Sequence, residues 1–160
     1  MPPQRILATL IYAVRGDQVL MLHRNKEPNL GLWVAPGGKI EFDESPQECA
    51  LRELLEETGL HGRNPRLRAV ITEVSTRDDY QWLMFIFVTD QIEGTMVDCQ
   101  EAGCSEGTLA WVPIAQVTHL PIPQADAIFF PRVMGSGPVF RAKFVYDDQL
   151  GIVSWQHYQE

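Results

Sequence analysis

The feature that constrains the fold most is a helix whose start and stop are both marked in the sequence. Ser45 is a favourable N-cap, Pro46 suits the first helical position, and Glu48 completes a capping box three residues after the cap. Gly59 favours the left-handed backbone conformation that commonly ends a helix. These signals predict a helix over residues 46–58.

Three glutamates gather on one side of this predicted helix. Glu53, Glu56 and Glu57 are spaced i, i+3, i+4, which places them within one sector of about 100°. Apolar residues occupy roughly the opposite side: Ala50, Leu51, Leu54 and Leu55. Like charges at this spacing destabilise a helix, but a hard divalent cation such as Mg²⁺ prefers carboxylate oxygens as ligands. The pattern fits either a solvated acidic face or a metal site.

Runs of strand-forming residues surround the helix. The expected strands are residues 6–14, 19–22, 66–75, 81–89, 109–112, 139–146 and 151–158, with a short strand at 33–34 inside a loop over 25–38. Residues 97–107 are expected to form a loop, and 122–134 a helix that Pro131 breaks or kinks. Strands around one or two helices, without a repeat or linker, predict a single α+β domain over residues 1–160.

Composition narrows the partners of the chain. The 160 residues include 13 Lys and Arg against 21 Asp and Glu, a net charge of −8, which argues against binding a nucleic-acid polymer. No apolar run reaches the roughly 18 residues of a membrane span, and the N-terminus lacks the pattern of a secretory signal. Cys49, Cys99 and Cys104 show no disulfide or zinc spacing, so free thiols in the cytoplasm are expected.

The predicted helix and the loop before it resemble the Nudix hydrolase box. That pattern is Gly, five residues, Glu, seven residues, Arg-Glu, an aliphatic residue, any residue, Glu-Glu, any residue, Gly and an aliphatic residue. The sequence matches it over residues 38–60 with Gly38, Glu44, Arg52, Glu53, Leu54, Glu56, Glu57, Gly59 and Leu60. The resemblance implies an α/β/α sandwich with a mixed sheet between helices. It also implies Mg²⁺-dependent hydrolysis, with Mn²⁺ as a substitute, of a nucleoside diphosphate linked to another group.

The resemblance also implies roles for individual residues. The metal would be held by the Gly37 carbonyl and by Glu53, Glu56 and Glu57. Arg52 would orient Glu53, which would act either as general base or as metal ligand only. Glu44 would brace the N-terminal side of the helix, and the glycines at 38 and 59 would be structural.

Members of the family often recruit a further acid from a distant loop. Glu106 fits that place best and Glu101 is the alternative. Arg24 and Lys39 are expected to contact phosphate groups of a substrate.

Beyond the box, the chain is most similar to the MutT-type branch, which hydrolyses oxidised purine nucleoside triphosphates to monophosphate and pyrophosphate. There, Asp126 would read the base edge and Trp33 would contact the base. Val34 and Ala125 depart from the Asn and the acid usual in eukaryotic-type members. ADP-ribose or a dinucleoside polyphosphate as substrate, or nucleotide sensing without cleavage, therefore stays open. So does a monomer or a homodimer.

Overall fold

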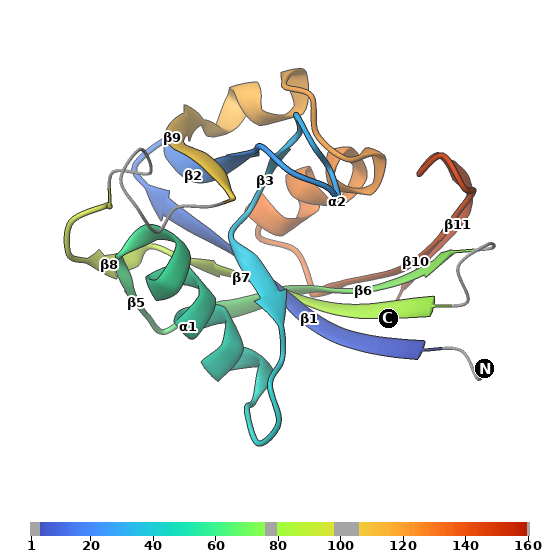
Figure 1. Cartoon of the computed structure of the whole chain (residues 1–160), viewed down its shortest axis with the longest axis horizontal. Coiled ribbons are helices and arrows are strands. Elements are labelled where there is room, and N and C mark those ends of the chain that lie inside the picture. The colour runs from blue at the N-terminus through green and yellow to red at the C-terminus, as the bar shows by residue number, and fades with distance from the viewer. Residues whose placement is uncertain (1–3, 76–79, 98–105, 160) are drawn as a thin grey trace.

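A computed structural model describes residues 4–75, 80–97 and 106–159 and contains a nine-stranded mixed sheet with a helix on each side (Figure 1). The sheet comprises β1 (Gln4–Arg15), β2 (Gln18–Arg24), β3 (Trp33–Val34), β4 (Gly37–Lys39), β6 (Arg66–Ser75), β7 (Tyr80–Thr89), β9 (Gly107–Pro113), β10 (Phe140–Tyr146) and β11 (Ile152–Tyr158). The remaining elements are β5 (His61–Arg63) paired with β8 (Gln91–Glu93), helices α1 (Pro46–Thr58) and α2 (Gln124–Met134), and the 3₁₀ helix η1 (Ile114–His119).

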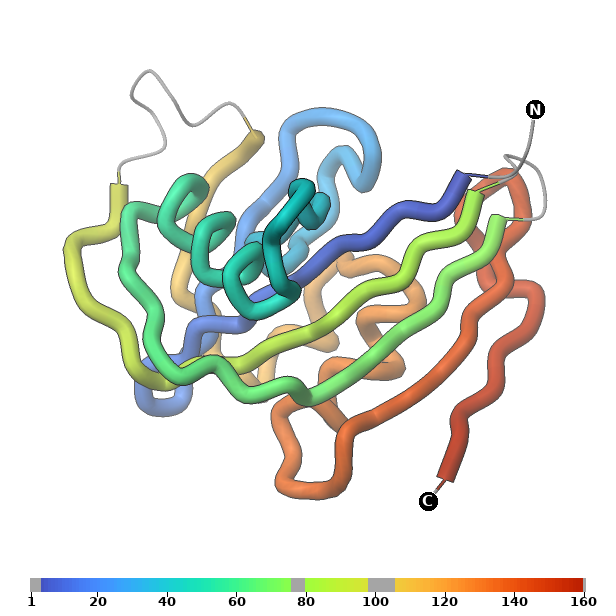
Figure 2. The backbone as a smooth tube through the Cα atoms, turned by 90° about the horizontal axis from the view of Figure 1, so that it is seen from below, coloured from blue at the N-terminus to red at the C-terminus, as the bar shows by residue number. Residues whose placement is uncertain are grey.

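The strand order is β11-β10-β6-β7-β1-β2-β3, with β4 added to β1 and β9 added to β2. Strands β1 and β7 run parallel, as do β6 and β10, and the other pairs are antiparallel. Figure 2 shows β1, β7, β6 and β10 running side by side. The mixed sheet between helices that the sequence predicted is therefore confirmed.

Strand β1 has different neighbours along one of its edges. Residues 8–10 pair with β4, whereas Val14 and Arg15 pair with β2. The sheet therefore forks along β1, so that the short strand β4 and the hairpin of β2 diverge from a shared strand.

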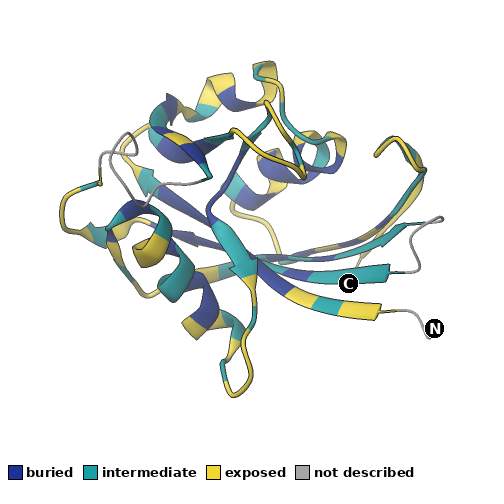
Figure 3. Ribbon diagram, viewed as in Figure 1, coloured by how far each residue is buried: buried dark blue, intermediate teal, exposed yellow. Residues whose placement is uncertain are grey.

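The two helices cover opposite faces of the sheet. Ala50 and Leu54 of α1 pack with alternate residues of β1, Ile11 and Ala13, in one core cluster. Residues of α2 pack on the other face in a second cluster: Ala125, Phe129, Phe130 and Val133, with Ala8 and Tyr12 of β1. Buried residues concentrate where strands and helices meet, and β11 is largely exposed (Figure 3).

The predicted helix over 46–58 is confirmed with its caps. The Ser45 hydroxyl accepts a hydrogen bond from the Glu48 N–H, and the Glu48 carboxylate accepts one from the Ser45 N–H, both at 3.1 Å. Gly59 has φ 79° and its N–H donates to the Leu55 carbonyl. Leu55, one of the apolar residues opposite the glutamates, is 39% exposed. The buried residues of α1 are Cys49, Ala50, Leu54 and Thr58, so the stripe that faces the sheet includes Cys49 and Thr58 in place of Leu55.

The break expected at Pro131 does not occur, because α2 continues through this residue to Met134. A proline in the last turn removes only one helical hydrogen bond. Arg68 on β6 then binds four carbonyl oxygens at this end of the helix, those of Arg132, Val133, Gly135 and Gly137.

Other expectations divide between confirmed elements and missed ones. The last two expected strands, 139–146 and 151–158, are present as the antiparallel pair β10 and β11. The short elements β4, β5, β8 and η1 were not predicted as regular structure, because three to six residues carry little periodicity. The described residues do not include Cys99, Glu101, Cys104 or residues 77–79, which lie between two of the expected strands. In the described part of the chain no helix is long and apolar enough to cross a membrane.

Candidate active site

Arg52 connects the acidic groups of the box. Its guanidinium donates to both oxygens of Glu44, at 2.6 and 2.9 Å. It also donates to Glu53 Oε1 at 2.9 Å, to Glu56 Oε2 at 3.2 Å and to the carbonyl of Lys39. The hydrogen bonds from Arg52 hold the pKa of Glu44 at about 2, well below its usual value of 4.5. Arg52 therefore anchors the loop before α1 to the acidic face of the helix.

Gly37 and Gly38 are glycines because their backbone lies against other groups. A Cβ atom at position 37 would meet the Thr9 carbonyl oxygen and the Leu10 backbone on β1. A Cβ at position 38 would meet the carboxylate of Glu53. The Gly37 N–H donates to Glu57 Oε2 at 2.8 Å. Strand β4 thereby brings its backbone against two of the three helix glutamates.

The carboxyl groups of Glu53 and Glu57 lie close enough to that of Glu106 for it to raise the pKa of both. Burial raises the pKa of Glu57 well above its usual range, and a hydrogen bond with the carboxyl of Glu106 raises it further. Burial also raises the pKa of Glu53, while Arg52 opposes that shift. Glu106 precedes β9 and also lies 3.6 Å from the cationic groups of Arg24 and Lys26. The acid expected from a distant loop is therefore next to the box.

The carboxylate oxygens of Glu53, Glu57 and Glu106 are ligands of the kind that a hard divalent cation prefers. The charges of these groups repel one another and raise the pKa of Glu53 and Glu57, and a cation among them would relieve this repulsion. The exposed side chain of Glu56 points to Arg52 instead. No three His, Cys, Asp or Glu side chains within the described ranges are drawn together into a metal-binding arrangement.

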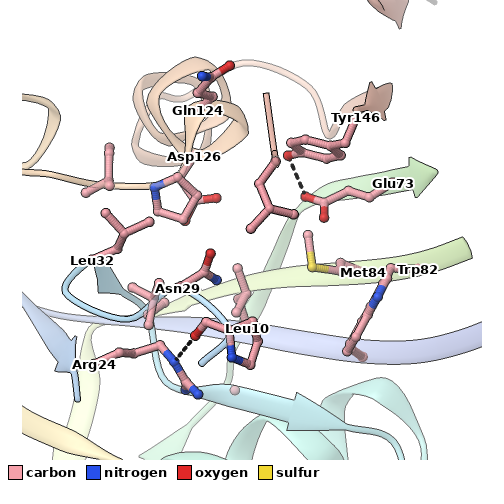
Figure 4. A pocket seen from close by; sticks show the side chains of 18 of the residues that line it. Leu10, Arg24, Asn29, Leu32, Glu73, Trp82, Met84, Gln124, Asp126 and Tyr146 are labelled. Atoms are coloured by element: carbon pink, nitrogen blue, oxygen red, sulfur yellow. Dashed lines mark hydrogen bonds between the residues drawn. The ribbon is translucent and has the colours of Figure 1, made fainter. Parts of the chain in front are cut away.

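One cavity of about 610 Å³ begins at the box and extends across the face of the sheet that α2 covers (Figure 4). Gly37, Gly38 and Glu57 line it at the box. Further residues of its wall are Leu10, Arg24, Leu32, Glu73, Trp82, Met84, Asp126 and Tyr146. This volume lies in the range typical of small-molecule sites.

The part of the cavity away from the box contains two acids, the half-buried Glu73 and the buried Asp126. The Tyr146 hydroxyl donates to Glu73 Oε1 at 3.3 Å. Burial raises the pKa of Glu73 to about 7, although the hydrogen bond from Tyr146 opposes that shift. Asp126 is 7% exposed, and burial, together with the charge of Glu73, raises its pKa well above the usual value.

The predicted substrate contacts separate in the structure. Arg24 and Asp126 line the cavity, and Arg24 Nε donates to the carbonyl of Pro28 at 2.7 Å. Lys39 is exposed on β4, and Trp33 stacks on His23 with ring centroids 4.6 Å apart; neither belongs to the cavity wall.

Val34 and Ala125, which depart from the MutT-type pattern, also lie in different parts of the structure. Val34 lines the cavity, whereas Ala125 is fully buried in the core under α2. Of the two residues, only Val34 therefore belongs to the cavity wall.

Sequence reasoning missed Glu73, although a signal for it exists. Ala69 and Ile71 are the buried residues of β6, and Glu73 continues their alternation on the same face. An acid at a core-facing strand position is unusual without a partner or a ligand. Tyr146 continues Phe140, Ala142 and Phe144 on β10 in the same way.

Comparisons with known proteins identify the family of the chain. The Nudix domain model matches residues 4–133, so the chain belongs to the Nudix family. An uncharacterised Nudix hydrolase of Bacillus subtilis (strain 168), YvcI, is 34% identical over 143 residues, which cover 88% of this chain and 86% of that protein. A MutT protein from Bacillus halodurans has a similar crystal structure, with a TM-score of 0.85 and 32% identity over 97% of this chain and 99% of that one. The human 8-oxo-dGDP phosphatase NUDT18 is 29% identical over 76% of this chain but only 37% of its own length.

Nudix hydrolases act on the pyrophosphate bonds of nucleotide-like substrates and generally need a divalent metal ion, usually Mg²⁺. The chain is a hydrolase of this class with a MutT-like fold.

Proposed function

We propose that the protein is a Mg²⁺-dependent pyrophosphohydrolase of purine nucleoside triphosphates, oxidised purines included, that releases the monophosphate and pyrophosphate. The observation that carries the proposal is the cavity that runs from Gly37, Gly38 and Glu57 to Asp126. It offers metal-binding acids to a polyphosphate at one end and polar groups to a base at the other. The similarity to a MutT protein over nearly the whole chain supports the same assignment.

The acids of the box provide the chemistry. The cation would be held by Glu53, Glu56, Glu57 and Glu106 with the Gly37 carbonyl, and when bound it neutralises phosphate charge and activates water. Glu53 is half-buried and contacts Arg52, so its carboxylate is held in one orientation. We assign to Glu53 the role of general base, which accepts the proton of the attacking water. The oxygen of this water adds to phosphorus as the bond from phosphorus to the pyrophosphate oxygen breaks.

The rest of the cavity would hold the nucleoside. Arg24 contributes a positive charge to the wall, suited to a phosphate oxygen. Leu10, Leu32, Trp82 and Met84 provide apolar surface for a base and a sugar. Asp126 provides a polar group beyond them for the edge of the base.

A product assay tests this function. The protein with Mg²⁺ is incubated separately with ordinary and 8-oxo purine triphosphates, pyrimidine triphosphates, ADP-ribose and dinucleoside polyphosphates, and the products are separated by chromatography. We expect purine monophosphate and pyrophosphate, and loss of turnover after chelation of the metal. Preferred cleavage of ADP-ribose or a dinucleoside polyphosphate would support the assignment as a hydrolase but refute purine nucleoside triphosphates as its substrates. Tight binding without any product would identify a sensing module.

The variant Glu53→Gln connects turnover to the box. We expect it to lose most activity, roughly a hundredfold or more, because a general base or metal ligand is removed. The control is Glu93→Gln, which makes the same chemical change on β8, where Glu93 is exposed and pairs with Arg63 at 2.8 Å. Full activity in Glu53→Gln would refute the role of Glu53.

A further inference from the structure

Glu73 is placed in the cavity by strand register. On β6 it is paired with Trp82 of β7 on one side and with Phe144 of β10 on the other. It lies on the sheet face that α2 covers, as do the buried residues Ala69 and Ile71. Its carboxyl group therefore enters the wall of the cavity from the middle of the sheet (Figure 4).

Asp126 approaches the same region from the opposite layer. It belongs to the stripe of α2 that faces the sheet, with Phe129, Phe130 and Val133 at helical spacing. Asp126 and Glu73 are close enough for the charge of one to raise the pKa of the other. Within the described residues neither carboxyl has a Lys, Arg or His side chain at ion-pair distance. Glu73 and Asp126 thus face the same part of the cavity, where a ligand can supply the hydrogen-bond donors.

We infer that Glu73 is a specificity-determining residue, which together with Asp126 accepts hydrogen bonds from a base edge with two adjacent N–H donors, as in guanine-type bases. An ionised carboxylate is an acceptor only, so a base that binds to the ionised acids must provide the donors. Guanine presents a ring N–H beside an exocyclic amino group. Adenine and cytosine present a ring acceptor beside their amino group, which a carboxylate repels. This inference rests on the proposed function, because it places a base in the cavity.

The electrostatics of the compartment support this choice. Among the described residues, the titratable groups that face Glu73 and Asp126 are the hydroxyls of Tyr146 on β10 and Tyr12 on β1, both of which burial keeps neutral by raising their pKa. Burial raises the pKa of Glu73 to about 7, so N–H donors that stabilise its charged form favour release of a proton on binding. Preference for a guanine-type base should therefore increase from pH 6 to pH 8.

Calorimetry tests the inference independently of turnover. The α,β-methylene analogues of guanosine and inosine triphosphate are titrated into wild type, Glu73→Gln and the control Glu93→Gln, each with Mg²⁺. Inosine lacks only the 2-amino group, so the ratio of the two affinities isolates that contact. We expect wild type and the control to prefer guanosine about tenfold or more, and Glu73→Gln to lose most of this preference. Gln can still accept the hydrogen bond of Tyr146, so a purely structural role of Glu73 would leave the ratio unchanged.

The outcomes separate this inference from the proposed function. Equal affinity of wild type for the two analogues, no binding of either, or an unchanged ratio in Glu73→Gln overturns the inference. Should Glu73→Gln fail to fold, the wild-type ratio at pH 6 and pH 8 decides, since a ratio that is unchanged or falls with pH contradicts an accepting carboxylate. Selective binding of the guanosine analogue without hydrolysis of the triphosphate would refute the proposed function and leave the inference standing.

Discussion

Arg52 and Glu44 form a two-point contact in which Nε and Nη2 of the guanidinium donate to the two carboxylate oxygens at 2.6 and 2.9 Å. The same guanidinium donates through Nη1 to Glu53 Oε1. Glu44, which lies before the helix, therefore fixes the orientation of the arginine that contacts the candidate general base.

Glu44→Gln tests this relationship. We expect a loss of about 1.5 to 3 kcal/mol in the free energy of unfolding at pH 7, because a charge-assisted pair is broken. Arg52 lowers the pKa of Glu44 from 4.5 to about 2, so the stabilisation is present above pH 4.5 and is lost as the pH falls toward 2. Urea unfolding at pH 7 and at pH 3 should show a smaller difference from wild type at pH 3. A difference that is equal or larger at pH 3 would contradict the assignment.

Substitutions at the two glycines should have different effects. In Gly38→Ala the new methyl group meets the end of the Glu53 side chain, which can move, so stability should change little. Displacement of Glu53 should nevertheless reduce kcat at least about tenfold. In Gly37→Ala the methyl group meets the backbone of β1, so a loss of more than about 2 kcal/mol in stability is expected. Gly137→Ala is the control, since nothing lies within 4 Å of its added Cβ.

Arg68 should contribute to stability through the end of α2. Arg68→Lys loses most of its four hydrogen bonds to carbonyl oxygens, at a cost of about 1 to 3 kcal/mol. Arg66→Lys, an exposed position on the same strand, provides the control and should change thermal unfolding little. Equal midpoints for the two variants would show that the contacts contribute nothing measurable.

Glu73 should make wild type less stable as the pH rises. Its pKa increases from 4.5 to about 7 on folding, so the folded state favours the protonated carboxyl group. The resulting contribution to the free energy of unfolding is fully present below pH 4.5 and is lost as the pH rises through 7. Glu73→Gln should remove up to about 3 kcal/mol of this pH dependence. Chemical denaturation of both proteins from pH 5 to pH 8 measures the difference, and parallel stability profiles would contradict a raised pKa of Glu73 in the folded protein.

Local signals explain which parts of this structure are predictable from sequence. The helix over 46–58 is marked by Ser45, Glu48 and Gly59, all within one short segment. The pairing of Gly37 and Gly38 with β1 depends instead on tertiary contact, because a three-residue strand has no periodicity of its own.

The wall of the cavity depends on strand register. Trp33 was expected to contact a base, but its pairing with His23 across β2 and β3 places the two rings in a stack outside the cavity wall. Glu73 and Tyr146 meet only because β6 and β10 are neighbours, which no segment of the sequence indicates by itself.

A crystal structure with Mg²⁺ and α,β-methylene guanosine triphosphate is the most direct test of the central claim, that one cavity binds both ends of a nucleotide. The account predicts Mg²⁺ on at least two of Glu53, Glu56 and Glu57, with the base within hydrogen-bonding distance of Glu73 or Asp126. A base bound outside the cavity, or a polyphosphate remote from the glutamates of α1, would contradict it.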